Sequence, residues 1–169
     1  MEWKDLSVSK ETSESIEQIK AWFHDNARSM AKPGMKKTMK SGYKVLFSGA
    51  VDTSKSLTAS LLGKEFGQEV YHVDLSQFVS KYIGETEKNL DKLFEKAEEK
   101  NWILFFDEAD ALFGKRTDVK DSHDKYSNQE ISYLLQKAES FQGLTILATS
   151  LKANSDTPFL RRFNSVVRF

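Results

Sequence analysis

The sequence predicts an α/β fold built on a five-stranded parallel sheet. Short apolar runs alternate along the 169 residues with longer segments whose apolar positions recur at helical spacing, which is the pattern of βα units. The run 102–106 is apolar on both faces, as expected of a strand at the centre of a parallel sheet. Three of the predicted strands end at Gly49, Asp107 and Ser150, and polar residues are found at or next to each of these ends. Because such folds bind ligands at the carboxyl ends of their strands, we expect a site there.

The predicted elements alternate from the first helix to the last strand. After an extended lead-in over residues 1–11, a helix begins near Thr12 and ends before the breaker Pro33-Gly34. Ser127 and Glu130 are expected to form a capping box at the start of the last long helix. We expect strands over residues 45–47, 70–74, 102–106, 144–149 and 166–169, and further helices over 55–66, 84–97 and 127–138.

Composition narrows the class of protein. Lys plus Arg and Asp plus Glu both number 25, so the formal net charge is zero, which argues against a general nucleic-acid binder. The chain has no Cys, so it has no disulfide framework and no thiolate metal site. The first residues lack the apolar stretch of a signal peptide, and no apolar run approaches the length of about 18 residues that spans a membrane. We therefore expect a single-domain cytoplasmic protein without membrane contact.

The stretch from Val45 to Ser56 has the layout of a phosphate-binding loop. An apolar strand stops at Gly49, a short polar turn follows, and Lys55-Ser56 opens a helix. In such loops backbone N–H groups surround the phosphates, the Lys reaches the β- and γ-phosphate oxygens, and the Ser or Thr hydroxyl binds Mg²⁺. The candidate phosphate-contacting residues are Gly49, Ala50, Val51, Asp52, Thr53, Ser54, Lys55, Ser56 and Leu57.

Two residues of this loop depart from the pattern G-x-x-x-x-G-K-[ST]. Ser54 stands where the second Gly is expected, and Asp52 puts a carboxylate where anionic phosphates would lie. A non-Gly residue forced into a left-handed conformation costs about 1–3 kcal/mol. Charge repulsion from Asp52 adds to that cost unless the carboxyl protonates or turns away. Together these effects predict a loss of phosphate affinity of roughly tenfold to thousandfold.

A second half of a nucleotide site is predicted at Asp107-Glu108, which closes the most apolar strand. The first acid can hold Mg²⁺ through water, and the second can position or deprotonate an attacking water. The alternative is an acidic cap on the following helix, since Asp and Glu are favourable at helix N-termini. The acidic pair lies about fifty residues after Lys55-Ser56, and this combination favours a nucleoside triphosphatase.

Six motifs resemble those of one family, the AAA+ ATPases, and in particular its compact bacterial type. They are L-F-S-G followed by K-S, Y-I-G-E-T-E-K-N-L, I-L-F-F-D-E-A-D-A-L-F-G-K-R, N-Q-E-I-S-Y-L-L-Q, I-L-A-T-S and F-L-R-R-F. The resemblance runs from about Trp3 to Phe169. It implies a P-loop nucleoside triphosphatase fold, a three-layer sandwich with helices on both faces of the sheet. It also implies ATP and Mg²⁺ as ligands, a nucleotide-binding core over residues 41–169, and residues 1–40 as lead-in and helix of the same domain.

The resemblance assigns roles to residues around the loop. It implies that Lys55 is the Walker A lysine and that Ser56 and Asp107 bind Mg²⁺. It implies that Glu108, in the Walker B motif with Asp107, is the catalytic base. Ser150 stands where the family usually has an Asn that senses the γ-phosphate. The helical lid that usually follows the last strand is expected to be absent.

The resemblance also implies an assembly. Arg161 and Arg162 resemble arginine fingers that reach the γ-phosphate of a neighbouring subunit, with a surface pair in salt bridges as the alternative. Such fingers imply a ring, expected to be a hexamer. Tyr82, Ile83 and Gly84 resemble the pore loop that grips a threaded polypeptide, with an ordinary packed turn as the alternative. We expect the partner to be a polypeptide or a protein complex rather than nucleic acid.

Three hypotheses about function remain open. The near-complete catalytic set predicts an ATPase that couples ATP hydrolysis to the remodelling of a protein partner. Asp52, Ser54 and Ser150 together predict instead a pseudo-ATPase or assembly module whose nucleotide binding is weakened or lost. The third hypothesis is a fragment or variant of an active parent.

Overall fold

The computed structural model describes residues 2–30, 42–50, 52–78, 85–110, 122–150 and 160–169, and of these it describes only the backbone for residues 26–30, 52–53 and 122–130. One parallel sheet runs through the described chain, with strand order β2-β3-β4-β1-β5. The predicted five-stranded parallel sheet is therefore confirmed. The strands are β1 (Tyr43–Ser48), β2 (Val70–Asp74), β3 (Ile103–Asp107), β4 (Leu144–Thr149) and β5 (Ser165–Arg168).

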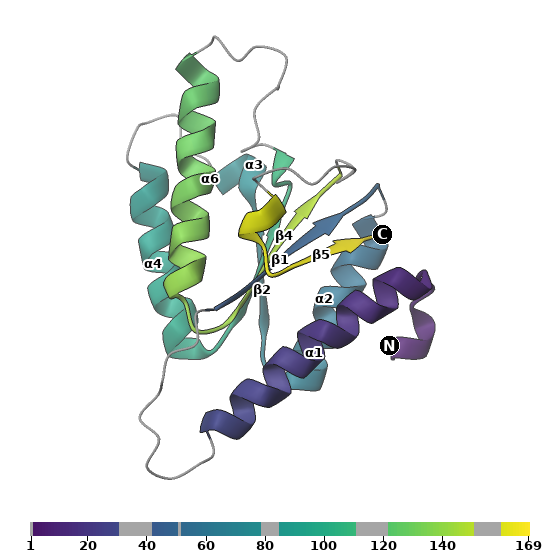
Figure 1. Cartoon of the computed structure of the whole chain (residues 1–169). Coiled ribbons are helices and arrows are strands. Elements are labelled where there is room, and N and C mark those ends of the chain that lie inside the picture. Colours follow the sequence, from purple (N-terminus) through teal and green to yellow (C-terminus); the bar gives the residue numbers. More distant parts are fainter. Residues whose placement is uncertain (1, 31–41, 51, 79–84, 111–121, 151–159) are drawn as a thin grey trace.

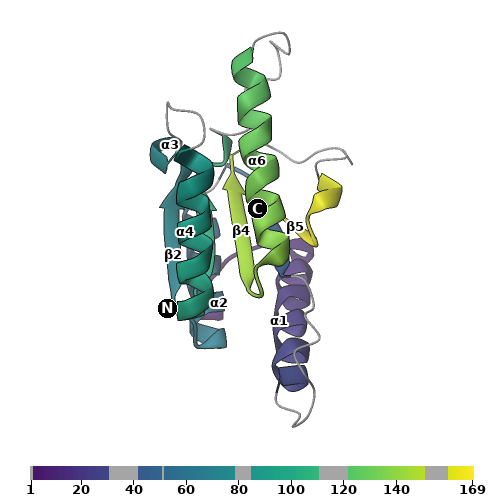
Figure 2. The ribbon, with the colours of Figure 1, turned by 90° about the vertical axis from the view of Figure 1, so that its left-hand side faces the viewer.

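Helices cover both faces of this sheet, as the three-layer prediction requires (Figures 1 and 2). On one face lie α1 (Lys10–Met30) and α2 (Asp52–Phe66), and on the other lie α4 (Glu85–Lys100) and α6 (Ser122–Ser140). Three short helices complete the described chain: η1 (Trp3–Asp5), α3 (Leu75–Phe78) and η2 (Leu160–Arg162). No helix within these described ranges is both long and apolar enough to cross a membrane.

The strand β3 is paired on both sides, although β4 rather than β3 is the middle strand of the sheet, and β3 contributes to a separate hydrophobic core on each face. Successive side chains of a strand point to opposite faces. Ile103 and Phe105 therefore join the core under α1 and α2, whereas Leu104 and Phe106 join the core under α4 and α6. All four are fully buried. Since burial of one such side chain stabilises the fold by about 1.5–3 kcal/mol, β3 is firmly held, and so is the acidic segment that follows it.

The first long helix packs against the sheet through its apolar stripe. Ile16 and Ile19 are buried in the core on that face. The rings of Phe23 and Phe66 stack with centroids 3.9 Å apart, which joins α1 to the end of α2. The hydroxyl of Thr12 donates a hydrogen bond to the backbone carbonyl of Arg168 at the end of β5. The described part of the N-terminal segment therefore contacts both α2 and the edge strand β5.

Two helix boundaries differ from the prediction. The helix α6 begins at Ser122, five residues before Ser127, so the predicted capping box lies inside the helix and is wrong as an N-terminus. Once a helix is nucleated, adding a residue costs little, so the buried half from Ile131 onward can support a polar extension. The helix α2 begins at Asp52 rather than at Lys55. This second difference changes the interpretation of the phosphate-binding loop.

Candidate nucleotide-binding site

The turn between β1 and α2 is short. The strand ends at Ser48 and the helix begins at Asp52, so only Gly49, Ala50 and Val51 lie between them, and Val51 is outside the described residues. Gly49 has a φ of 139°, a conformation that side chains with a Cβ rarely adopt. A Cβ at this position would lie 2.6 Å from the carbonyl oxygen of Phe169. The first glycine of the pattern is therefore required by both backbone conformation and space.

Lys55 lies in the first turns of α2 and is buried, with 1% of its surface exposed. Its Nζ donates hydrogen bonds to the carbonyl oxygens of Gly49 at 2.8 Å and of Thr149 at 2.9 Å. A buried ammonium group is tolerated only when such partners replace water. The same Thr149 carbonyl also accepts the N–H of Gly49, at 3.2 Å. Lys55 thus connects α2 to the ends of β1 and β4.

Ser54, the residue in the place of the second glycine, has a helical backbone. It lies inside α2, and the non-glycine residues with positive φ in the described chain are Asn101 and Glu108. Its carbonyl accepts a hydrogen bond from the hydroxyl of Thr58 at 2.7 Å, as is common one turn along a helix. The predicted strain cost at Ser54 is therefore wrong, because a helical position does not require glycine.

The other predicted loop residues belong to the beginning of the same helix. Asp52 and Thr53 are its first two residues, and their side chains are not described. Ser56 and Leu57 follow Lys55 and are half-buried, and Ala50 is exposed. The site that these residues form is a helix N-terminus preceded by a short turn. Backbone N–H groups in the first turn of a helix have no partner within the helix and can bind an anion.

The predicted catalytic acids follow the buried strand β3. Asp107 is its last residue and is half-buried, and Glu108 is exposed. The Oδ1 atom of Asp107 accepts the backbone N–H of Glu108 at 2.8 Å. Glu108 has a φ of 57°, a left-handed conformation that costs a non-glycine residue about 1–3 kcal/mol and is often found at functional sites. Ala109 then donates its N–H to the carbonyl of Ala148 at 3.0 Å, which ties this turn to β4.

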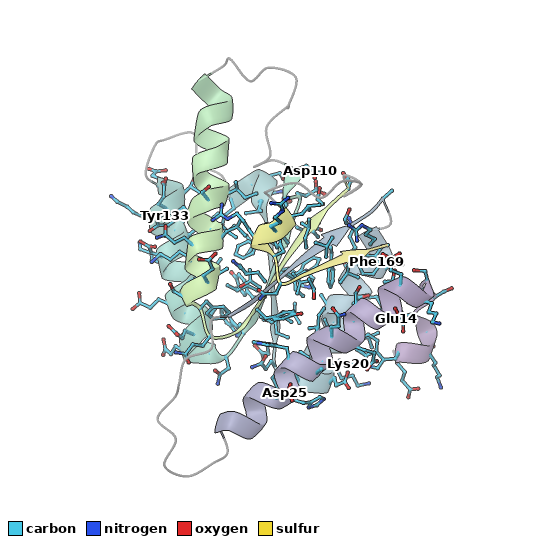
Figure 3. All side chains as sticks on the ribbon, in the orientation of Figure 1. Glu14, Lys20, Asp25, Asp110, Tyr133 and Phe169 are labelled. Carbon is cyan, nitrogen blue, oxygen red and sulfur yellow. The ribbon has the colours of Figure 1, made fainter. Side chains whose placement is uncertain are left out.

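Asp110 is a residue of this site that the sequence analysis did not single out. Its carboxylate accepts hydrogen bonds from the hydroxyls of Thr149 and Ser150, and from the backbone N–H of Ser150 at 3.4 Å. Figure 3 shows Asp110 near the upper ends of the strands. The signal was the third acid of Asp107-Glu108-Ala109-Asp110. Its partners depend on the pairing of β3 with β4, which a sequence pattern does not give.

The two predicted arginine fingers lie on the short helix η2. Arg161 is exposed on η2, and Arg162 donates from Nη1 to the hydroxyl of Ser132 on α6 at 3.2 Å. The predicted pore loop, Tyr82-Ile83-Gly84, lies outside the described residues. The structure therefore gathers the residues at the ends of β1, β3 and β4, while Arg162 contacts α6.

The donor set suits a hydrated magnesium ion. Within the described ranges, no group of three or more His, Asp or Glu side chains is placed to hold a metal ion. Mg²⁺ at nucleotide sites is commonly bound by one or two protein oxygens together with substrate phosphates and water. The Ser56 hydroxyl and the Asp107 carboxylate are oxygen donors of this kind, at the start of α2 and the end of β3.

A polar cluster lies away from the strand ends, between α4 and α6. Asp91 accepts hydrogen bonds from the Tyr133 hydroxyl at 2.6 Å and from Lys137 Nζ at 2.8 Å. The hydrogen bond from Lys137, followed by that from Tyr133, lowers the pKa of the Asp91 carboxyl below its usual value. The same hydrogen bonds raise the pKa of Tyr133 and of Lys137.

Comparison with known proteins agrees with this arrangement. The sequence model of the family described as "ATPase family associated with various cellular activities (AAA)" matches residues 45–169. An uncharacterised AAA family ATPase of Sinorhizobium fredii is 35% identical over 128 residues, which are 75% of this chain and 38% of that protein. Cell division protein C of Sulfolobus acidocaldarius is 34% identical over 128 residues, covering 70% of this chain and 34% of that protein.

A third relative extends the similarity over more of the chain. Protein SAV of Sulfolobus acidocaldarius is 26% identical over 161 residues, which are 95% of this chain and 20% of that protein. The chain thus spans well under half the length of these relatives. Membership of this family implies nucleotide binding, typically with Mg²⁺. The family match and the parallel sheet with its strand-end site lead to one conclusion: the chain belongs to the AAA family of ATPases.

Proposed function

We propose that this chain binds MgATP at the β1–α2 turn and hydrolyses it, and that hydrolysis is coupled to the remodelling of a protein partner. The observation that supports this proposal best is Lys55. A buried lysine at the start of a helix is held by two carbonyls at the ends of β1 and β4. The strand β4 pairs with β3, whose last residue, Asp107, is followed by Glu108. A change of the Lys55 rotamer would bring its ammonium group from these carbonyls to a phosphate bound at the turn.

In this proposal each residue has one task. Lys55 leaves the carbonyls of Gly49 and Thr149 and donates to phosphate oxygens. Ser56 and Asp107 would hold a magnesium ion, which would neutralise charge on the phosphates. Glu108 is exposed and accepts the proton of the attacking water, and the fixed turn beneath it keeps its backbone in place.

The proposal includes an assembly. The family generally acts as oligomers on partners, and we propose a ring, a hexamer, in which Arg161 and Arg162 reach the nucleotide of the neighbouring subunit. Exposure of Arg161 supports this role, and Arg162 would have to leave Ser132 to share it. We propose that Tyr82-Ile83-Gly84 contacts a polypeptide in the ring. We propose that the chain is of the bacterial type, which one of the reported relatives, that of Sinorhizobium fredii, represents, and that the ring works in the cytoplasm, where ATP is supplied.

The second candidate is an assembly module that binds nucleotide weakly or not at all. The observation in its favour is Asp52, which is the first residue of α2. A carboxylate in the first turn stabilises a helix through the partial positive charge that would otherwise attract a phosphate. Asp52 would then compete with nucleotide for the same helix end. The presence of Ser54 in place of the second glycine does not support this candidate, because the backbone of Ser54 is helical.

Calorimetry with MgATP separates the two candidates. We expect the wild-type chain to bind MgATP and Lys55→Ala to lose binding by at least about a hundredfold, since one charged contact is replaced by none. Lys64→Ala is the matched control, because Lys64 is an exposed lysine in the last turn of the same helix. Circular dichroism checks that each variant is folded. Absence of MgATP binding by the wild-type chain would contradict the ATPase proposal and favour the assembly module.

A further inference from the structure

Asp110 is bonded to both residues at the end of β4, and we propose that it is a positioning residue of the nucleotide site. By fixing Thr149 and Ser150, it sets the position of Lys55 and directs the Ser150 hydroxyl away from the nucleotide. The effect on the lysine stands on the geometry alone. The effect on nucleotide selectivity rests on the ATPase function proposed above.

The turn at Glu108 brings Asp110 to β4. Glu108, the residue after β3, has a left-handed backbone with a φ of 57°. The backbone bond from Ala109 to the Ala148 carbonyl then aligns this turn with the last residues of β4. Asp110, the next residue, lies beside Thr149 and Ser150 and contacts both of them. One hydrogen bond between backbone groups and three to the Asp110 carboxylate therefore join the turn after β3 to the end of β4.

The chemistry of the bonds fixes which atoms donate. An ionised carboxylate only accepts hydrogen bonds, so the hydroxyl hydrogens of Thr149 and Ser150 both point to Asp110. A serine hydroxyl has one hydrogen to donate. While Ser150 donates to Asp110, it has no donor left for a γ-phosphate. An Asn at this position would have two N–H donors and could serve both.

Thr149 carries the effect of Asp110 to the lysine. Its hydroxyl is held by Asp110, and its carbonyl accepts Lys55 Nζ at 2.9 Å. The same carbonyl accepts the N–H of Gly49, the required glycine of the turn. Removing the Asp110 carboxylate removes the hydrogen bond that holds the Thr149 hydroxyl. Lys55 and Gly49 would then donate to a carbonyl whose position is less constrained. Asp110 thus acts on Lys55 through one residue, without touching it in the described interactions.

Competitive lysine labelling tests the lysine effect without nucleotide. The full chain is reacted with an acylating reagent, and mass spectrometry gives the relative labelling rate of each lysine. We expect Asp110→Ala to raise the rate at Lys55 at least about threefold. Lys44 is the internal control, because it is also buried and donates to Glu139 at 2.6 Å. A rise at Lys44 as large as that at Lys55, or no rise at Lys55, would overturn the proposal.

Asp74→Ala is the matched control variant. Asp74 is the last residue of β2 and, like Asp110, accepts hydrogen bonds from a backbone N–H and a hydroxyl, in this case both of Ser76. We expect this variant to leave the labelling of Lys55 unchanged. An equal rise at Lys55 in Asp74→Ala would show that any lost strand-end acid has this effect, and it would refute a special role for Asp110.

Nucleotide selectivity tests the Ser150 effect. We expect Ser150→Asn to raise the ratio of the MgADP to the MgATP dissociation constant about three- to tenfold, the value of one added hydrogen bond to the γ-phosphate. The gain should be absent in Asp110→Ala/Ser150→Asn, because the amide is no longer oriented. An equal gain in both backgrounds would overturn the selectivity claim. If no variant binds nucleotide, the ATPase proposal fails and the selectivity claim fails with it, while labelling still decides the role of Asp110 toward Lys55.

Discussion

The two sides of the candidate site hold their residues in different ways. On the β3–β4 side, Asp107 and Thr149 end strands that are buried and paired in register, as Phe106 is with Leu147. On the β1–α2 side, position depends on a three-residue turn and the start of a helix. Side chains at strand ends inherit their positions from the core, whereas a phosphate-binding turn depends on its own backbone. Substitutions on the two sides should therefore have different consequences.

Glu108→Gln tests the strand-end side and has the largest expected effect. Loss of a general base lowers a rate by roughly a hundred- to ten-thousandfold. The amide keeps the size of the side chain, so MgATP affinity should change less than about threefold. Steady-state turnover and calorimetry on the same preparation measure the two effects. Turnover equal to that of the wild-type chain would remove Glu108 from the proposed mechanism.

Lys55→Ala acts on both sides, because the lysine joins them. Its removal leaves the carbonyls of Gly49 and Thr149 without this donor. An unsatisfied buried polar group costs about 1–3 kcal/mol, so we expect the free energy of unfolding to fall by that amount. Urea unfolding measures the loss, and Lys64→Ala should change it by less than about 0.5 kcal/mol. A stability equal to that of the wild-type chain would mean that the two hydrogen bonds contribute nothing net.

Asp52→Gly tests the turn side. Removing one negative charge from the first turn of α2 should tighten MgATP binding by about tenfold, because a like charge near the phosphates is lost. The gain in affinity should be larger at low ionic strength than at high ionic strength, where the repulsion between exposed charges is screened. Calorimetry at two ionic strengths checks both expectations. Weaker binding by Asp52→Gly would show that the carboxylate helps to build the site.

Ser54→Gly sharpens the contrast within the turn side. Ser54 is helical, so a glycine there should cost up to about 1 kcal/mol of unfolding free energy and leave MgATP affinity nearly unchanged. Denaturant unfolding and calorimetry provide the two values. A tenfold gain in affinity from this single change would restore the sequence-based interpretation, in which the missing second glycine weakens the loop.

Asp91→Asn tests a region that belongs to neither side of the candidate site, and we expect it to have the smallest effect, which is on stability. The pKa of Asp91 is lowered in the folded state, so its contribution to stability is present above the unfolded pKa and is lost as pH falls through the folded pKa. The side chains of Asp91 and Lys137 are 45% and 38% exposed, which limits the contribution to less than about 1 kcal/mol at neutral pH. The stability difference from wild type should shrink below about pH 4. A difference that persists at pH 2 would not be electrostatic.

Much of the fold could be predicted from sequence because its strands are continuous apolar runs. The predicted strands 70–74 and 144–149 match β2 and β4, and the other three lie within two residues of the observed bounds. The start of α6 was missed because its first turns are polar and carry no periodic signal. The four-residue helix α3 is too short for periodicity to reveal it.

The site was predictable only in part. Residues at strand ends were found because the end of an apolar run marks them, as at Asp107. The network of Asp110 was not, because it depends on a left-handed turn at Glu108 and on which strand lies beside β3. The cost assigned to Ser54 was wrong for a related reason: a motif gives residue types, while only the backbone shows whether glycine is needed. The roles of the site residues in catalysis stay predictions.

The helix α6 joins two regions that the chain places far apart. Ser132 contacts Arg162 of η2, and the next residue, Tyr133, contacts Asp91 of α4. Consecutive helical residues point about 100° apart, so one turn of α6 faces both neighbours. As long as both hydrogen bonds persist, a displacement of α4 moves the anchor of Arg162 with it. We therefore expect the orientation of this arginine to respond to movements of α4, the helix that begins at Glu85.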